Sequence, residues 1–152
     1  MRIIGLISDT HGLLRPEAKQ ALSGVERIIH AGDIGSRAIL DELGSVAPVV
    51  AVRGNNDKGD WAHDIADTEV VEIDGVSIFT LHDVKELDLD PKAAGFAVVV
   101  AGHSHRPSIE EKDGVLFVNP GSAGPRRFSL PVSVGFLEID HGVVRARLKT
   151  LL

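Results

Sequence analysis

Residues 2–7 read RIIGLI, and they run directly into the polar segment SDTH at positions 8–11. A short, continuous apolar run of this kind is typical of a strand buried on both faces of a sheet. Comparable apolar runs occur at 26–29, 46–52 and 96–101, and polar residues follow each of them. We therefore expect a buried sheet whose strand ends carry the chemistry of the protein.

Helix signals separate the first three of these runs. Pro16 precedes a helix-compatible segment, 17–22, and Ser36 is a potential N-cap of a helix reaching Leu43, with Gly44 just past its end. The resulting order β-α-β-α-β predicts parallel strands in the first half of the chain.

The second half of the chain carries hairpin signals instead. Asp-Gly between two apolar runs is a strong signal of a two-residue hairpin turn. A parallel half followed by a hairpin-rich half predicts two sheets packed face to face, with helices outside, in one domain of residues 1–152. The expected hairpins join 70–73 to 76–81, 108–112 to 115–118, and 132–139 to 143–148.

Composition limits the chemistry of this chain of 152 residues, which has seven His, no Cys and a net charge of −6. The absence of Cys excludes disulfides and thiolate nucleophiles, so any metal must be bound by His nitrogen and by Asp, Glu or Asn oxygen. The acidic balance argues against a general nucleic-acid coat, but not against a small anionic substrate at a metal. With no candidate membrane span or signal peptide, we expect a cytoplasmic protein without a membrane partner.

Five of the apolar runs end in side chains that can bind a metal ion. The carboxyl ends of parallel strands share one edge of a sheet, so we expect these side chains to meet in one crevice. The i,i+2 pairs Asp9–His11 and His103–His105 would each point to one side if these strand ends are extended. A mixed oxygen and nitrogen ligand set suits Mn, Fe, Co, Ni or Zn better than Ca or Mg. The candidate ligands are Asp9, His11, Asp33, Asn55, His82, His103 and His105.

These strand ends resemble the motifs of the calcineurin-like metallophosphoesterase superfamily, and in particular of its small single-domain phosphodiesterase branch. The resemblance covers essentially the whole chain and implies an α/β (α+β) fold: a four-layer αββα sandwich of two mixed β-sheets flanked by helices. It rests on SDTHG (8–12), HAGDIG (30–35), RGNND (53–57), LHD (81–83), AGHSH (101–105) and the late segment NPGS (119–122) followed by Pro125-Arg126.

The resemblance also implies a metal-dependent phosphodiesterase, a phosphoric ester hydrolase with a dinuclear metal centre. A water bridging the two ions would lose a proton and attack phosphorus in line. Mn is the expected metal, with Ni, Fe, Co, Zn and Mg as alternatives. The expected partner is a small phosphodiester, with nucleic acid only as a substrate, and a homo-oligomer is compatible with the sequence. One ion would be held by Asp9, His11, Asp33 and His105, and the other by Asp33, Asn55, His82 and His103.

Two positions depart from the family pattern. Many members have His where this chain has Asn56, and Asn cannot act as a general acid near neutral pH. Members often have Gly after the ligand at position 82, where this chain has Asp83 and Val84. We expect Asp57 to orient a ligand or water through hydrogen bonds, with an ordinary turn residue as the alternative. The candidate catalytic residues are Asp33, Asn55, Asn56 and Asp57.

Other residues leave alternatives open. Arg126 and Arg127 either contact a phosphate or form an exposed pair in a turn, whereas His30 is expected to make a structural hydrogen bond. Trp61 is expected to pack in the core or an interface, with the lining of the substrate entrance as the alternative. The competing hypothesis is a non-catalytic interaction module, because the retromer scaffold subunit resembles this family in fold. Retention of all seven ligand types favours the enzyme, since a scaffold has no need of them.

Overall fold

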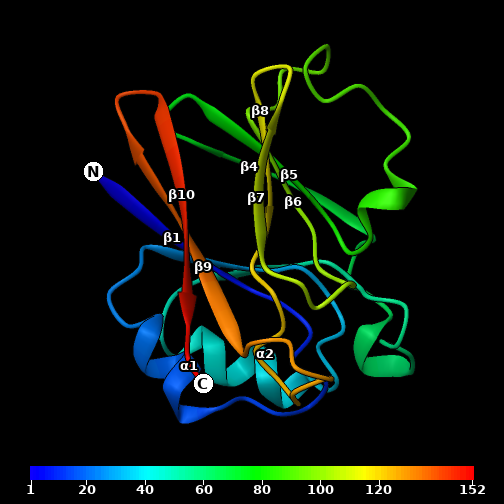
Figure 1. The fold of residues 1–152 in the computed structure, drawn as a ribbon. Coiled ribbons are helices and arrows are strands. Elements are labelled where there is room, and N and C mark those ends of the chain that lie inside the picture. The colour runs from blue at the N-terminus through cyan, green and yellow to red at the C-terminus, as the bar shows by residue number, and fades with distance from the viewer.

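The computed structural model describes residues 1–152 and contains two five-stranded β-sheets that form a sandwich (Figure 1). The first sheet has the order β10-β9-β1-β2-β3. Its strands are β1 (Arg2–Ile7), β2 (Arg27–His30), β3 (Val49–Ala51), β9 (Ser133–Asp140) and β10 (Val143–Thr150). The neighbours β1, β2 and β3 are parallel, whereas β9 and β10 pair antiparallel, so this sheet is mixed.

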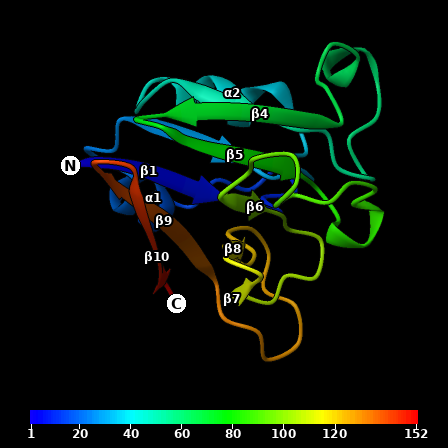
Figure 2. The same cartoon turned by 90° about the horizontal axis from the view of Figure 1, so that it is seen from above.

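The second sheet has the order β4-β5-β6-β8-β7, and its strands follow one another in this order down the view of Figure 2. It is mixed as well, because β5, β6 and β8 are parallel while β4 and β7 pair antiparallel at the edges. Its strands are β4 (Thr68–Ile73), β5 (Val76–Leu81), β6 (Val98–Val100), β7 (Ser108–Lys112) and β8 (Val115–Asn119). The sandwich class predicted from the sequence is therefore confirmed.

Apolar side chains from both sheets fill the space between them. Ile4 and Leu6 of β1 meet Val98 and Val100 of β6 in this core, and all four are fully buried. Alternate residues of a strand face one side of a sheet, so one set of side chains from each strand supplies this layer. The core holds the two sheets together and fixes the relative position of their strand ends.

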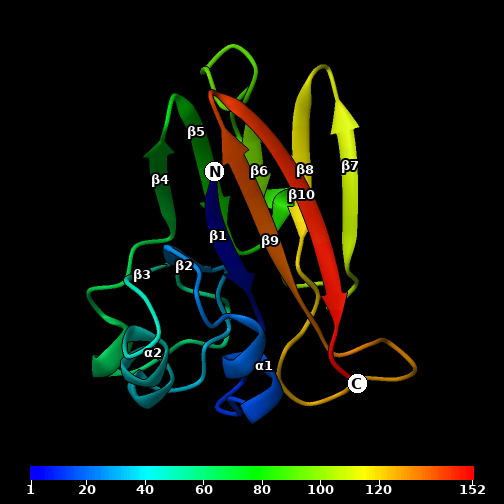
Figure 3. The ribbon, with the colours of Figure 1, turned by 90° about the vertical axis from the view of Figure 1, so that its left-hand side faces the viewer.

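Both α-helices lie beside the first sheet (Figure 3). They are α1 (Pro16–Ala21) and α2 (Arg37–Gly44), and they bury Ala18 and Leu43 against this sheet. Gly44 is the last residue of α2 rather than the residue after its end. No helix of the structure is long and apolar enough to cross a membrane.

The outer face of the second sheet is covered by a different kind of layer. The segment between β5 and β6 contains only the short 3₁₀ helix η2 (Val84–Glu86), and its side chains Leu87 and Leu89 pack on Phe79 and Val99. The fourth layer of the sandwich is thus mainly loop. A second 3₁₀ helix, η1 (Asp60–Ala62), follows β3.

The three predicted hairpins are confirmed, with turns between β4 and β5, β7 and β8, and β9 and β10. The prediction of a long buried strand at 46–52 is wrong, because only the half-buried residues 49–51 form β3. This strand lies at the edge of the first sheet and pairs only with β2, which has four residues and matches it from Ile28 to His30, so the short partner limits its length.

Candidate metal centre

The seven candidate ligands come together where strands of both sheets end. Asp9, His11, Asp33 and Asn55 follow strands of the first sheet, and the three His residues follow β5 and β6 of the second. The ligand atoms form two adjacent groups with Asn55 beside the second, so the seven residues meet where strand ends of the two packed sheets adjoin, and not at the edge of one sheet.

The first group consists of Asp9, His11 and His105. Oδ1 of Asp9 lies 3.3 Å from Nε2 of His105 and 3.6 Å from Nε2 of His11. The two imidazoles stack, with their Nε2 atoms 3.4 Å apart. One carboxylate oxygen and two ring nitrogens therefore face a common point, as the ligands of a transition-metal ion do.

The second group consists of Asp33, His82 and His103, with Asn55 beside them. Oδ2 of Asp33 lies 3.3 Å from Nε2 of His82, which in turn lies 3.3 Å from Nδ1 of His103. The side-chain oxygen of Asn55 lies 3.2 Å from the same nitrogen of His103. This group also combines oxygen and nitrogen donors.

Asp33 faces both groups. Its Oδ2 atom lies 3.3 Å from His82 in the second group and 3.7 Å from His11 in the first. Its other oxygen, Oδ1, accepts a hydrogen bond from the backbone amide of Asn56 at 2.9 Å. One oxygen is thus held by the backbone while the other lies between the groups, a placement that suits a bridging carboxylate.

Asp9 is held in the same manner and provides a test of whether the residues fit a metal ion. Its Oδ2 atom accepts hydrogen bonds from the hydroxyl of Ser8 at 2.6 Å and from the amide of His103 at 3.1 Å. Its Oδ1 atom is buried and has no hydrogen-bond partner. A buried carboxylate oxygen without a donor is costly unless a cation occupies the site, so the residues fit a metal.

Neighbouring side chains and amides keep both carboxylates charged. Burial raises the pKa of Asp9, but His105, His11 and the Ser8 hydroxyl outweigh this effect and hold the pKa well below its usual range. For Asp33, the hydrogen bonds from His82 and from the Asn56 amide likewise outweigh burial and lower the pKa.

His82 has the opposite shift. Burial lowers its pKa, but the hydrogen bonds with Asp33 and with the carbonyl of Ala31 outweigh burial and raise the pKa to about 9. Its Nδ1 atom donates to that carbonyl at 2.7 Å, which turns Nε2 toward Asp33. In the metal-free protein His82 therefore carries a proton at Nε2, where the metal ligand atom would be.

His30 is buried behind the site and has a structural role, as the sequence indicated. Its Nδ1 atom accepts from the amide of Gly32, so Nε2 carries the proton and donates to the Thr10 hydroxyl at 3.0 Å. That hydroxyl donates to the carbonyl of Ile34 at 2.7 Å. Burial lowers the pKa of His30 to about 4, which keeps the ring neutral and the chain of hydrogen bonds intact.

Five of the seven ligand residues have left-handed backbone conformations, with φ values between 47° and 71°. This corrects the argument that the i,i+2 pairs lie on extended strand ends, because these residues lie in loops after the strands and have left-handed backbone. Asp9 and His11 still contribute to one group, whereas His103 and His105 divide between the two groups. Such conformations are uncommon and cluster at functional sites. The five residues are Asp9, His11, Asp33, His103 and His105.

Two glycines allow the ligand loops to approach one another. A Cβ atom on Gly54 would lie 2.1 Å from Oδ1 of Asp33, and one on Gly102 would lie 2.0 Å from the Ser8 hydroxyl. Any side chain at these positions would displace the carboxylate or its hydrogen-bond donor. The motifs Gly-Asn and Gly-His therefore combine a ligand with a preceding residue that must be small.

Asp57 lies beneath the second group and does not face the ligand atoms. Its carboxylate accepts hydrogen bonds from the backbone amides of Ile34 and Gly35 and, at 2.8 Å, from that of Gly54. These amides belong to the loops that carry Asp33 and Asn55. Asp57 therefore ties the two ligand loops together and positions them.

Residues of the late segment 119–122 support the site, although ligand spacing alone did not single them out. The side-chain amide of Asn119 donates to the carbonyl of Gly102 and to the hydroxyl of Ser104, both at 3.0 Å. The hydroxyl of Ser122 donates to the carbonyl of Asp9 at 3.0 Å. The polar residues Asn119 and Ser122, which follow a buried apolar run, were the only indication in the sequence that this segment supports the ligand loops.

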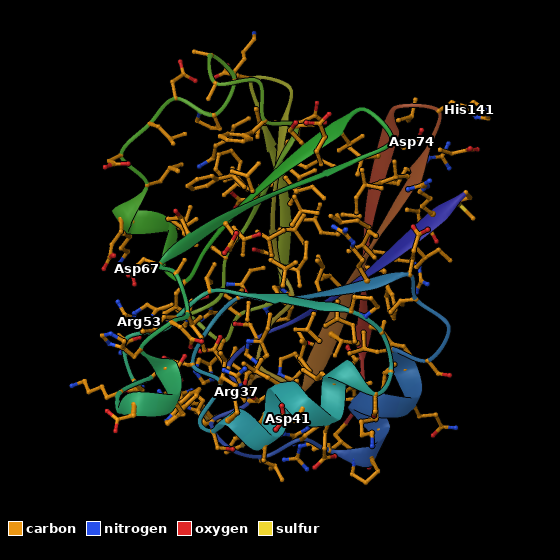
Figure 4. The ribbon with its side chains drawn as sticks, turned by 180° about the vertical axis from the view of Figure 1, so that it is seen from behind. Arg37, Asp41, Arg53, Asp67, Asp74 and His141 are labelled. Carbon is orange, nitrogen blue, oxygen red and sulfur yellow. The ribbon has the colours of Figure 1, made fainter.

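Of the remaining candidates, Arg53 lines a surface pocket together with the ligands Asn55, His82 and His103. Arg126 and Arg127 are exposed in the loop before β9. Arg53 pairs with Asp67 at 3.0 Å, and Figure 4 shows both at the margin of the molecule. Trp61 packs against the helix-side core, as expected from the sequence.

Comparison with known proteins identifies relatives along nearly the whole chain. A model of the calcineurin-like phosphoesterase superfamily domain matches residues 1–142. A probable metallophosphoesterase of Methanothermobacter thermautotrophicus is 37% identical over 150 residues, which cover 91% of this chain and 86% of the relative. A phosphodiesterase of Methanocaldococcus jannaschii is 32% identical over 156 residues, covering 90% of this chain and 93% of the relative.

Solved structures share the fold. That of an archaeal phosphodiesterase superposes with a TM-score of 0.79 at 31% identity, covering 97% of this chain and 99% of the other. Zinc-complexed Vps29 from Entamoeba histolytica has a TM-score of 0.77 at 21% identity and 99% coverage of both chains. The second likeness shows a common fold alone.

Proposed function

The chain belongs to the calcineurin-like phosphoesterase superfamily, and from this premise we propose that it is a phosphodiesterase with a dinuclear metal centre. The observation that carries the proposal is the position of Asp33 Oδ2, which lies 3.3 Å from one ligand group and 3.7 Å from the other. A carboxylate oxygen in this position suits a pair of ions that share it. We further propose Mn²⁺ as the native ion and a small phosphodiester as the substrate.

The proposed ligand sets follow from the two groups. Asp9, His11 and His105 would hold one ion and His82, His103 and Asn55 the other, with Asp33 shared by both. When bound, two divalent ions supply Lewis acidity, which lowers the pKa of water and stabilises the charge that develops on a phosphoryl group.

The protein itself positions and restrains these ligands. Ser8 and the amide of His103 fix the orientation of the Asp9 carboxylate, and the amide of Asn56 fixes that of Asp33. Hydrolysis adds water across one P–O ester bond and releases an alcohol and a phosphomonoester. The side chain of Asn56 donates to Oδ2 of Asp33 at 3.2 Å, so it supports the bridging carboxylate and offers no proton to the leaving alcohol.

A non-catalytic scaffold is the second candidate, because Vps29 shares the fold. The orphaned Oδ1 of Asp9 fits a bound cation but does not separate the two candidates, because zinc-complexed Vps29 has the same fold. The enzyme is favoured by phosphodiesterase relatives at 32% and 31% identity.

Reconstitution tests the proposal. Metal-stripped protein is loaded with Mn²⁺ and, in parallel, with Ni²⁺, Fe²⁺, Co²⁺, Zn²⁺ or Mg²⁺, and hydrolysis of bis-p-nitrophenyl phosphate and p-nitrophenyl phosphate is measured. We expect Mn²⁺-dependent hydrolysis that favours the diester and is abolished by Asp33→Asn. The matched control Asp41→Asn changes an exposed carboxylate on α2 and leaves the rate unchanged. Two bound ions without turnover of either ester would favour the scaffold.

A further inference from the structure

A cavity of about 290 Å³ lies beside the metal centre, on the outer face of the second sheet. Its floor is formed by apolar side chains of β6, of β8 and of the residue that follows β6. They include Val99, Phe117 and Ala101. One wall is the start of η2, and the opposite wall is the edge strand β7; both segments can be followed in Figure 1. The loop-like fourth layer leaves this part of the sheet uncovered by a helix.

The cavity is continuous with the ligand groups through His103, which lines it and also contributes Nδ1 to the second group. The other ring nitrogen of His103, Nε2, lies 3.7 Å from the carboxylate of Asp83. Asp83 and its neighbour Val84 line the cavity as well. Asp83 and Val84 are also the two positions after the ligand His82 at which this chain differs from the family pattern. The residues peculiar to this chain therefore line the cavity.

The chemistry of the cavity fits a planar, uncharged group that forms hydrogen bonds. Its charged side chains other than His103 are two Lys and two carboxylates, so they balance, and a second phosphate finds no net attraction. The ammonium of Lys112 lies over the Phe117 ring, 5.6 Å from its centroid, so a planar ligand reaches this aromatic face when the exposed Lys112 side chain moves aside. Ser108 contributes a hydroxyl group at the rim. The four charged residues are Asp83, Lys85, Glu110 and Lys112.

We propose that this cavity binds the nucleobase of a nucleoside phosphodiester whose phosphate lies at the metal centre. The inference rests on the proposed phosphodiesterase function and adds the substrate class to it. The cavity volume of about 290 Å³ lies just below the ~300–1,000 Å³ found for ligand pockets, which suits a single base and not a polymer. An aromatic base on Phe117 gains stacking that a methyl group cannot provide.

Two esters with the same leaving group isolate the effect of the base. They are thymidine 5′-(p-nitrophenyl phosphate) and methyl p-nitrophenyl phosphate, measured with the Mn²⁺-loaded protein. We expect KM for the thymidine ester to be at least ~10-fold lower than KM for the methyl ester, with kcat values within a few-fold, because the base adds binding that is uniform between ground and transition states. Equal KM values would overturn the proposal.

The edge strand β7 provides a matched pair of variants. Glu110 lines the cavity, whereas its neighbour Glu111 points to the opposite side of the strand, and both are exposed. Glu110→Trp fills the cavity, so the KM advantage of the thymidine ester should fall at least ~10-fold. Glu111→Trp makes the same substitution with the same change of charge and should preserve the advantage. An equal loss in both variants would contradict the assignment.

Binding without catalysis separates this inference from the proposed function. Thymidine is titrated into the metal-free protein, and amide shifts are followed by NMR. We expect the amides of Ser104, Ser108 and Phe117 to shift, and Glu110→Trp to abolish these shifts. Shifts without turnover of either ester would support the cavity and overturn the phosphodiesterase. Turnover without shifts or base preference would support the phosphodiesterase and overturn the cavity.

Discussion

The two ligand groups differ in their access to solvent. In the first group Asp9 and His105 are buried and His11 is half-buried, whereas the second group combines the buried Asp33 and His82 with the exposed His103 and Asn55. Of these ligands, His103 borders the cavity. Under the proposed function, the first group would retain its ion and the exposed ligands of the second would meet the substrate.

Removing a ligand from either group provides the strongest test of this comparison. Asp9→Asn replaces the buried carboxylate by a neutral amide, so we expect loss of the first ion and a fall in hydrolysis of at least ~10³-fold, since a lost Lewis acid costs several kcal/mol of transition-state stabilisation. His103→Asn should lose the second ion but keep the first. Metal content after gel filtration and the rate on bis-p-nitrophenyl phosphate check both. Retention of two ions by either variant would contradict the assignment of that group.

Asp57→Asn tests the support beneath the second group. An amide has one acceptor oxygen, so it cannot accept from the amides of Ile34, Gly35 and Gly54 together. We expect about 1–3 kcal/mol of lost stability and ~10–100-fold weaker binding of the second ion, with the first ion less affected. Chemical denaturation and metal titration measure the two effects, and Asp60→Asn is the exposed control. Equal weakening at both sites would mean that Asp57 supports the whole centre.

Proton release distinguishes the second group in another way. His82 has a pKa raised to about 9, so its proton stabilises the metal-free protein below pH ~6.5, and this contribution is lost as the pH rises through about 9. A metal ion must displace this proton. Apparent affinity for the second ion should therefore rise up to ~10-fold per pH unit between pH 7 and 9. Calorimetry in two buffers of different ionisation enthalpy counts the proton, and its absence at pH 7 would show that His82 is neutral before binding.

The smallest expected effect concerns the leaving group. Without an acid at Asn56, the wild-type rate should fall steeply as the pKa of the leaving alcohol rises. Asn56→His supplies an imidazole beside the exposed second group, so hydrolysis of an alkyl ester should rise ~10-fold while that of a p-nitrophenyl ester changes little. A rate that is flat against leaving-group pKa in the wild type would indicate another acid.

The sequence predicted the parts of this molecule that follow from local pattern. Asp74-Gly75 and Asp113-Gly114 marked two hairpins because few residues accept the backbone of a tight turn. The convergence of the ligands followed from the rule that parallel strands end at one edge. Applying that rule requires only the directions of the strands, and these can be predicted from sequence without knowing which side chains are in contact.

Other features depend on tertiary contacts and were not predictable in this way. The extent of β3 is limited by its short partner β2, and the covering of the second sheet is decided by how Leu87 and Leu89 pack. The support that Asn119 and Ser122 give to loops far away in sequence is a property of the folded chain. The cavity beside His103 also exists only once β7 and η2 are placed.

The left-handed backbone at five ligand residues constrains how this site can change during evolution. Asn, Asp and His are the residues other than Gly that best tolerate this conformation, and they are also residues that offer oxygen or nitrogen to a metal. We expect a descendant that loses an ion to accept mainly Gly or Asn at these positions, because most other side chains strain the turn. Its loops would then keep their course, so the shape of the site can be inherited by lineages that no longer use its chemistry.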